Sequence, residues 1–193
     1  MRIIGGKYKG IKLIPPIGIK IRPTSDRLKE SIFSIIASNK YEINIDGSDV
    51  LDICSGTGSL GIEAFSRGAI SVYFIDKNQK SIELIYKNLA KLKIDGQIQN
   101  NIKIIKDEAT KALKNITKIF QIVLIDPPYN THIIEKCLFK LKELNLINQE
   151  SYIFAESSKT ENFNFDGYQI LDIKIYGSSK LTILRLLSSS SIK

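Results

Sequence analysis

The chain of 193 residues has no tryptophan, one methionine, one histidine and two cysteines. Cys54 and Cys137 lie far apart and lack the spacing of metal ligands, so we expect two buried free thiols and no metal site. Apolar runs stay well short of the roughly 20 residues that a membrane-spanning helix needs, and the N-terminus lacks the apolar core of a secretion signal. Free thiols without such a signal are typical of a reducing compartment, which predicts a cytoplasmic protein.

Acidic residues are scarce at the N-terminal end. Residues 1–29 contain eight basic residues and one acid, Asp26, whereas the whole chain has a net charge of +8. A basic end of this kind is typical of a surface that contacts nucleic-acid phosphates, and a solvated basic arm without a partner is the alternative. The residues expected to contact RNA are Arg2, Lys7, Tyr8, Lys9, Lys12, Arg22 and Arg27.

A hydrophobic content of 43% and a charged content of 25% are typical of a globular protein with a substantial core. We expect residues 1–22 to form a small basic β-hairpin extension with short strands at 2–4 and 8–14. The main domain is expected to span 23–187 and to open with a helix that Thr24 or Ser25 caps. Residues 188–193 are expected to be a disordered tail.

From residue 49 onward, strand-like and helix-like periodicity alternate along the chain. Strands are predicted at 50–54, 70–76, 102–106, 119–126 and 151–157, and helices at 59–67, 78–93 and 133–146, with a short helix ending at 113. This alternation predicts a mostly parallel α/β sheet with its site at the carboxyl ends of the strands.

The last two apolar runs, 168–176 and 180–187, leave no room for a crossover helix between them. They must therefore pair as an antiparallel hairpin. Together with the five earlier strands, this hairpin gives a seven-stranded sheet. A closing hairpin favours the Rossmann-like class I methyltransferase fold over a nicotinamide-binding sheet.

A glycine-rich loop follows the first of these strands. Gly56, Gly58 and Gly61 satisfy a dinucleotide-type fingerprint, with Asp76 twenty residues beyond Gly56 as the acid that binds ribose hydroxyls. The pattern predicts a nucleoside ligand, and a purely structural turn is the alternative. Asp52, upstream of the glycines, favours S-adenosylmethionine, because a pyrophosphate is repelled by a carboxylate whereas the ammonium of a methionine moiety is attracted.

Asp107 follows the third strand and is suited to accept a hydrogen bond from an adenine amine, although a helix cap would look the same. Acids at three successive strand ends thus match the amino group, the ribose and the adenine of S-adenosylmethionine. The expected cofactor-binding residues are Asp52, Ser55, Gly56, Thr57, Gly58, Asp76, Asp107 and Asp126, the last because it would face the methyl donor.

The stretch Asp126-Pro127-Pro128-Tyr129 ends the fourth strand as a stiff, extended loop, since each proline fixes its own φ and restricts the residue before it. One carboxylate, the Pro127 carbonyl and one ring are the groups needed to hold a planar base by its exocyclic amine. An ordinary strand end with a Pro-Pro turn is the alternative. Neither cysteine is well placed as the nucleophile that methylation of a pyrimidine carbon would need.

For two further residues near this loop, His132 and Glu156, the sequence gives only weak evidence of a role. His132 is interpreted as a surface or capping residue rather than a catalytic one. Glu156, at the end of the fifth strand, either lines the substrate side or is an ordinary surface acid.

These motifs resemble those of the RsmD family of bacterial small-subunit ribosomal RNA guanine-N2 methyltransferases. The similarity runs through nearly the whole chain, in segments 2–10, 22–33, 55–69 and 126–129. It implies a class I methyltransferase, S-adenosylmethionine as donor, and one guanine N2 of 16S RNA as acceptor, in an assembling ribosomal subunit. The family commonly has Glu where Asp76 stands, which leaves the reach of this acid in question.

The leading hypothesis is therefore a ribosomal RNA guanine-N2 methyltransferase, with Asp126, Pro127 and Tyr129 as catalytic residues. An adenine-N6 methyltransferase acting on DNA or RNA is the nearest alternative. A nicotinamide-dependent oxidoreductase and a non-catalytic RNA-binding assembly factor are remoter ones. The oligomeric state is open, with a monomer favoured.

Overall fold

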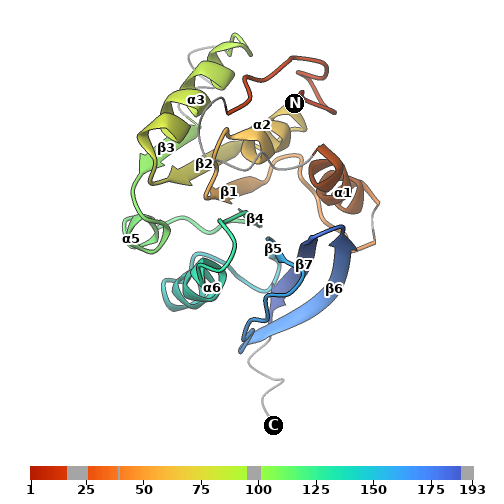
Figure 1. The fold of residues 1–193 in the computed structure, drawn as a ribbon, viewed down its shortest axis with the longest axis vertical. Coiled ribbons are helices and arrows are strands. Elements are labelled where there is room, and N and C mark those ends of the chain that lie inside the picture. Colours follow the sequence, from red (N-terminus) through yellow and green to blue (C-terminus); the bar gives the residue numbers. More distant parts are fainter. Residues whose placement is uncertain (17–25, 39, 95–100, 188–193) are drawn as a thin grey trace.

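The computed structural model describes residues 1–16, 26–38, 40–94 and 101–187. Arg22, the expected caps Thr24 and Ser25, and the expected tail at 188–193 lie outside these ranges. A single seven-stranded sheet, in the order β3-β2-β1-β4-β5-β7-β6, forms the centre of the molecule (Figure 1). Its strands are β1 (Asp49–Ile53), β2 (Ser71–Asp76), β3 (Ile102–Lys106), β4 (Ile122–Ile125), β5 (Tyr152–Ser158), β6 (Tyr168–Tyr176) and β7 (Ser179–Leu186).

The pairing of the strands confirms the predicted sheet. β1 pairs in parallel with β2 and β4, and β5 continues the parallel part beside β4. β7 is antiparallel to both β5 and β6, so the chain closes in the expected hairpin. Because β1 lies between β2 and β4, the strand order reverses beside β1, and a ligand site is expected at the carboxyl ends there.

Helices cover both faces of the sheet (Figure 1). Side chains from α1 (Asp26–Ala37), α2 (Ser59–Ser66) and α3 (Gln79–Ala90) pack in one apolar cluster with Val50, Phe74 and Leu124 of the strands. α5 (Ala109–Leu113) and α6 (Ile133–Glu143) pack in a second cluster with Leu51, Ile75 and Val123. Neighbouring strand residues point to opposite faces, which explains why the buried strands read as unbroken apolar runs in the sequence.

The N-terminal segment does not form the two strands that the sequence predicts. A single β-bridge joins Arg2 to Lys12, and the residues between them form turns. Ile3 and Leu13 are buried in the first apolar cluster, so the segment is packed onto the domain rather than projecting from it. The Ile4 amide donates to Glu63 Oε2 at 2.8 Å, and the Tyr8 amide donates to Ser66 Oγ at 3.0 Å. Backbone hydrogen bonds still pair the two arms around the bridge, with the Ile3 amide donating to the Ile11 carbonyl at 3.0 Å, so the segment is a short hairpin anchored on α2.

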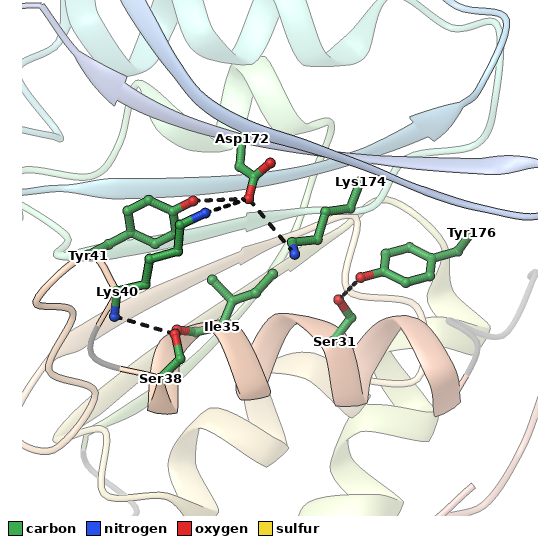
Figure 2. Close-up of polar contacts among 8 residues, drawn as sticks. All are labelled: Ser31, Ile35, Ser38, Lys40, Tyr41, Asp172, Lys174 and Tyr176. Atoms are coloured by element: carbon green, nitrogen blue, oxygen red, sulfur yellow. Dashed lines mark hydrogen bonds and ion pairs between the residues drawn. The ribbon is translucent and has the colours of Figure 1, made fainter.

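α1 and the connection after it are tied to the edge strand β6 by polar contacts (Figure 2). Asp172 of β6 accepts hydrogen bonds at 3.0 Å from Lys40 Nζ and from the Tyr41 hydroxyl. The hydrogen bond from Lys40 is the main reason that the pKa of Asp172 is lowered. Ser31 of α1 is hydrogen-bonded to Tyr176, near the end of β6. Within the described ranges, no helix combines the length and the apolar character needed to cross a membrane.

Candidate active site

A cavity of about 580 Å³ lies at the carboxyl ends of β1, β2, β3 and β4. Its wall combines the glycine-rich loop, the ends of β2 and β3, and the Asp-Pro-Pro-Tyr loop after β4. The residues expected from the sequence that line it are Ser55, Gly56, Thr57, Asp76, Asp107, Asp126, Pro127 and Tyr129. Gly58, also expected to bind the cofactor, is instead buried against core side chains and does not line the cavity. Sequence motifs that span more than 70 residues of chain therefore meet around one space large enough for a nucleoside-type ligand.

The glycine-rich loop turns tightly between β1 and α2. Gly56 and Gly58 adopt positive φ values of 56° and 76°, which side chains rarely permit. The Ser55 hydroxyl donates to the Asp52 carbonyl at 2.7 Å, and the Gly58 amide donates to the Ser55 carbonyl, also at 2.7 Å. The loop is therefore held in shape by its own hydrogen bonds, and its backbone forms part of the cavity wall.

Asp76 is half-buried at the end of β2 and holds the loop from the side. One carboxylate oxygen accepts the Gly56 amide and the other accepts the Asn78 amide, each at 2.8 Å. Each oxygen has a second lone pair, and the residue lines the cavity, so the carboxylate still has capacity for ligand hydroxyls.

Asp52 is placed differently from the sequence-based expectation. Its side chain is 1% exposed, does not line the cavity, and accepts the Gly61 amide at 2.9 Å. This contact ties the end of β1 to the first turn of α2 beneath the loop. We therefore revise its expected role, from a contact with a ligand ammonium to a buried support of the glycine-rich loop.

Burial raises the pKa of Asp52 to about 7, with the Gly61 amide opposing the rise and Asp76 adding to it. The unfolded chain releases this proton near the ordinary value of 3.8, so the stability contributed by protonated Asp52 is full below that pH. It is lost as the pH rises toward about 7. Relative to Asp52→Asn, the wild-type free energy of unfolding should fall by roughly 4 kcal/mol between about pH 4 and about pH 8. Urea unfolding of both proteins across this range measures the difference; a constant difference would contradict the buried, protonatable state.

Asp107 lies just past β3 and lines the cavity. Its Oδ1 accepts the amide of the next residue, Glu108, at 2.7 Å, while the helix cap of α5 is Glu108 rather than Asp107. Asp107 is therefore not the cap of α5. Its half-buried carboxylate lies at the cavity wall, where it can accept a hydrogen bond from a ligand.

The Asp-Pro-Pro-Tyr loop leaves β4 directly beside the end of β1. Ile53 and Ile125 are register partners, and the Asp126 amide donates to the Ile53 carbonyl at 3.3 Å. Pro127 is buried, whereas Asp126 and Tyr129 are half-buried and line the cavity. The Tyr129 hydroxyl lies 3.0 Å from Ser179 Oγ and donates to Glu156 Oε1 at 3.3 Å. These contacts of the hydroxyl hold the Tyr129 ring at the cavity wall.

The structure shows the positions of Glu156 and His132, for which the sequence left the role open. Glu156 is 3% exposed and reaches Tyr129, so it is not a surface acid. The His132 side chain is 72% exposed, pairs with Glu135 and does not line the cavity, which agrees with a surface residue.

Neither cysteine is suited to nucleophilic catalysis in this structure. Cys54 lines the cavity, but burial raises the pKa of its thiol far above neutrality. Burial also raises the pKa of Cys137, to about 12. Both thiols are free, as expected from the sequence, but only Cys137 is buried and Cys54 is half-buried.

Several cavity residues were not anticipated from the sequence. Lys77 and Asn78 directly follow Asp76 at the end of β2, whereas Thr131 precedes α6 and Ile133 and Lys136 belong to its first turn. No motif marks the residues at α6, because they reach the cavity only through the packing of this helix. A lysine one turn into an amphipathic helix looks like any solvent-facing residue.

The basic residues expected to contact RNA divide between two edges of the sheet. The Lys7 amide donates to the Ser66 carbonyl at the end of α2. The chain after α2 lies at the amino end of β1, because the Ile70 amide donates to the carbonyl of Ser48, just before β1. Exposed Lys7 and Lys9 thus lie on the edge opposite the cavity. Arg27 instead stacks on Tyr176, at 5.6 Å from the ring centroid, on the cavity side.

Tyr8 is also engaged within the protein. Its ring stacks on Phe65, with 5.9 Å between centroids and 11° between planes. Arg2 and Lys12 form the β-bridge and have exposed side chains. Tyr8, which is expected to contact RNA, therefore has one face of its ring covered by Phe65.

The fold is that of a class I methyltransferase. It is defined by the strand order, by the closing hairpin and by the acid-lined cavity beside β1, where the strand order reverses. A family model described as "Conserved hypothetical protein 95" matches residues 1–185. The chain belongs to this family, the RsmD family of methyltransferases.

Individual relatives agree with this assignment. An uncharacterized methylase of Rickettsia prowazekii is 30% identical over 96% of this chain and 97% of its own length. Ribosomal RNA small subunit methyltransferase D of Escherichia coli is 32% identical over 81% of this chain and 74% of its own. A solved Escherichia coli structure, provisionally named as a methyltransferase, superposes with a TM-score of 0.81 at 26% identity and covers 96% of this chain and 97% of its own.

Proposed function

We propose that this protein transfers a methyl group from S-adenosylmethionine to the exocyclic N2 of a guanine in small-subunit ribosomal RNA. The observation that supports it most directly is that Asp126, Pro127 and Tyr129 line the same cavity as Asp76 and the glycine-rich loop. An amine-binding loop thus adjoins a nucleoside-type cofactor site. Relatives named as ribosomal RNA small subunit methyltransferases suggest which nucleic acid supplies the amine.

The cavity suits the proposed cofactor in its chemistry. Backbone at Gly56 permits close approach of a ligand, and the Asp76 carboxylate has capacity for two ribose hydroxyls. Asp107 would accept from the adenine amine. S-adenosylmethionine supplies an activated methyl group on a sulfonium; Ser55, Gly56 and Thr57 would hold it with the methyl toward Asp126.

The acceptor nitrogen needs help, because its lone pair is delocalised into the ring. Hydrogen bonds from the amine to the Asp126 carboxylate and the Pro127 carbonyl would let the nitrogen pyramidalise. Its lone pair then forms the new N–C bond as the S–C bond breaks, and the amine proton leaves to Asp126 or to water. Stacking on Tyr129 would contribute roughly 1–3 kcal/mol, and placement for in-line attack can supply about 7–11 kcal/mol.

The proposed RNA surface extends over both edges of the domain. Arg27 stacks on Tyr176 at the carboxyl end of β6, whereas Lys7 and Lys9 lie beyond the far end of α2, an eight-residue helix about 12 Å long. An RNA that contacts both therefore spans more than one nucleotide beside the target base. This breadth fits a folded RNA in an assembling subunit better than a short single strand.

Replacing Lys7, Lys9 and Lys12 together by alanine should weaken RNA binding without affecting the cofactor site. Three fewer phosphate contacts should reduce the slope of log affinity against log salt by about 2–3. Filter binding at several salt concentrations measures this slope. The matched control replaces three exposed lysines elsewhere, Lys114, Lys142 and Lys159. An unchanged slope in the N-terminal variant would refute the proposed basic surface.

The experiment that tests the function is transfer of labelled methyl to small subunits, followed by nucleoside analysis. N2-methylguanosine is the expected product. N6-methyladenosine would replace the guanine assignment by the adenine alternative, and absence of label in any nucleoside would reject methyl transfer to RNA.

A further inference from the structure

The loop that carries Tyr129 is tied to the far side of the sheet at two points. At the first, the Tyr129 hydroxyl contacts Ser179 Oγ at 3.0 Å and Glu156 Oε1 at 3.3 Å. At the second, the amide of the next residue, Asn130, donates to Glu161 Oε1 at 2.7 Å. All three partners come from β5, β7 and the turn after β5, so the antiparallel end of the sheet supports the loop.

The first tie crosses from the cavity into the protein interior. Glu156 and Ser179 are 3% and 4% exposed, and neither lines the cavity, whereas Tyr129 does. The phenol thus has a buried hydroxyl end and a ring at the cavity wall. A ring fixed at its far end keeps a defined plane, which is what a stacking platform requires.

The second tie is a carboxylate clamp. Glu161 accepts the Asn130 amide with one oxygen and the Ser158 amide with the other, at 2.7 and 2.8 Å. Lys180 Nζ donates to the Glu161 carbonyl, which holds the acid to β7 as well. Asn130 itself has a φ of 58°, in the left-handed region, so the chain turns sharply just where the clamp grips it.

We propose that Glu156 and Glu161 are positioning residues of the methyl-transfer site. By fixing the plane of Tyr129 and the exit of its loop, they set the angle at which the stacked base presents its amine. The proposal rests on the proposed function, since it takes that base to be the substrate. Neither acid touches the base or the cofactor, so their contribution is geometric.

The clamp predicts a particular division of effects. Loosening the loop should lower kcat, because the reacting nitrogen spends less time in line with the methyl group. Cofactor affinity should not change, because the residues proposed to hold the cofactor lie at the carboxyl ends of β1, β2 and β3, away from Glu156 and Glu161. Replacing a residue that merely stabilised the fold would instead lower the thermal stability, kcat and the cofactor affinity together.

The test compares Glu161→Ala with Glu161→Gln, which keeps one acceptor oxygen, and with the exposed-acid control Glu150→Ala. Hydrogen exchange at the Asn130 amide, kcat for small subunits and calorimetry with S-adenosylhomocysteine are measured on each. For Glu161→Ala, exchange should be about tenfold faster and kcat about 10- to 100-fold lower, with unchanged cofactor affinity. Glu161→Gln should fall between wild type and alanine.

Tyr129→Phe and Glu156→Gln test the first tie. Each should lower kcat, and the effect of Glu156→Gln should be smaller in the Tyr129→Phe background, because both changes act on one contact. Equal effects of Glu156→Gln in both backgrounds would overturn the first tie.

For the second tie, unchanged exchange in Glu161→Ala, an unchanged kcat, or a parallel loss of kcat and cofactor affinity would each overturn positioning. If the wild type methylates adenine instead of guanine, only the guanine assignment fails. The rate ratios are then measured on that product, and they decide the positioning proposal separately.

Discussion

Asp126→Ala should lower methyl transfer to small subunits by about 10³-fold or more, while binding of S-adenosylhomocysteine stays close to wild type. The carboxylate lines the cavity, and its backbone amide, which the substitution keeps, is bonded to the Ile53 carbonyl. The loop should therefore hold its path when the side chain is removed. The proposed acceptor for the substrate amine is then lost, while the backbone hydrogen bond to Ile53 is kept.

The measurement is single-turnover transfer of labelled methyl at saturating cofactor, with calorimetry on the same preparations. Asp126→Asn keeps one acceptor oxygen and should retain an intermediate rate. The exposed acid Asp166, replaced by alanine, controls for loss of charge. Near-normal transfer by Asp126→Ala would show that another group orients the amine; a large loss of cofactor affinity would place Asp126 on the cofactor instead.

Much of the sheet was predictable because its strands are short apolar runs separated by helical periodicity. The predicted boundaries of the third and sixth strands coincide with β3 and β6, and the closing hairpin followed from the three residues between its arms. Local spacing also brought Asp76, Asp107 and Asp126 to one edge, since each follows a parallel strand. That edge is where the structure forms its cavity.

What local spacing does not reveal is the direction of a side chain within a strand. Asp52 comes before the end of β1 and points into the protein, toward Gly61, whereas an acid at the strand's end would reach the cavity. A shift of one residue along a strand reverses the face, so the motif alone leaves its role open.

Long-range contacts explain the other differences. The N-terminal segment bonds to α2 across 58 and 59 residues of chain, and these contacts hold the short hairpin against the domain. Tyr129 finds Glu156 and Ser179 at separations of 27 and 50 residues. No pattern within a window of sequence encodes such partners, because they depend on how β5 and β7 pack beside β4.

Asp76→Ala should weaken binding of S-adenosylhomocysteine by about 100-fold or more, since two charge-assisted hydrogen bonds of about 1.5–3 kcal/mol each would be lost. The same change releases the Gly56 amide, so the glycine-rich loop also loses its lateral support. Calorimetry measures the affinity, and Glu83→Ala, at an exposed acid of α3, is the control for charge.

Asp76→Glu distinguishes the two contributions. The longer side chain keeps the carboxylate for ribose hydroxyls but moves it by one methylene relative to the Gly56 and Asn78 amides, both now at 2.8 Å. Retention of most of the affinity would show that ligand contact dominates and that this family position tolerates either acid. A loss of cofactor affinity as large as that of Asp76→Ala would show that support of the glycine-rich loop contributes more than ligand contact. The glutamate would then fail to hold the Gly56 amide.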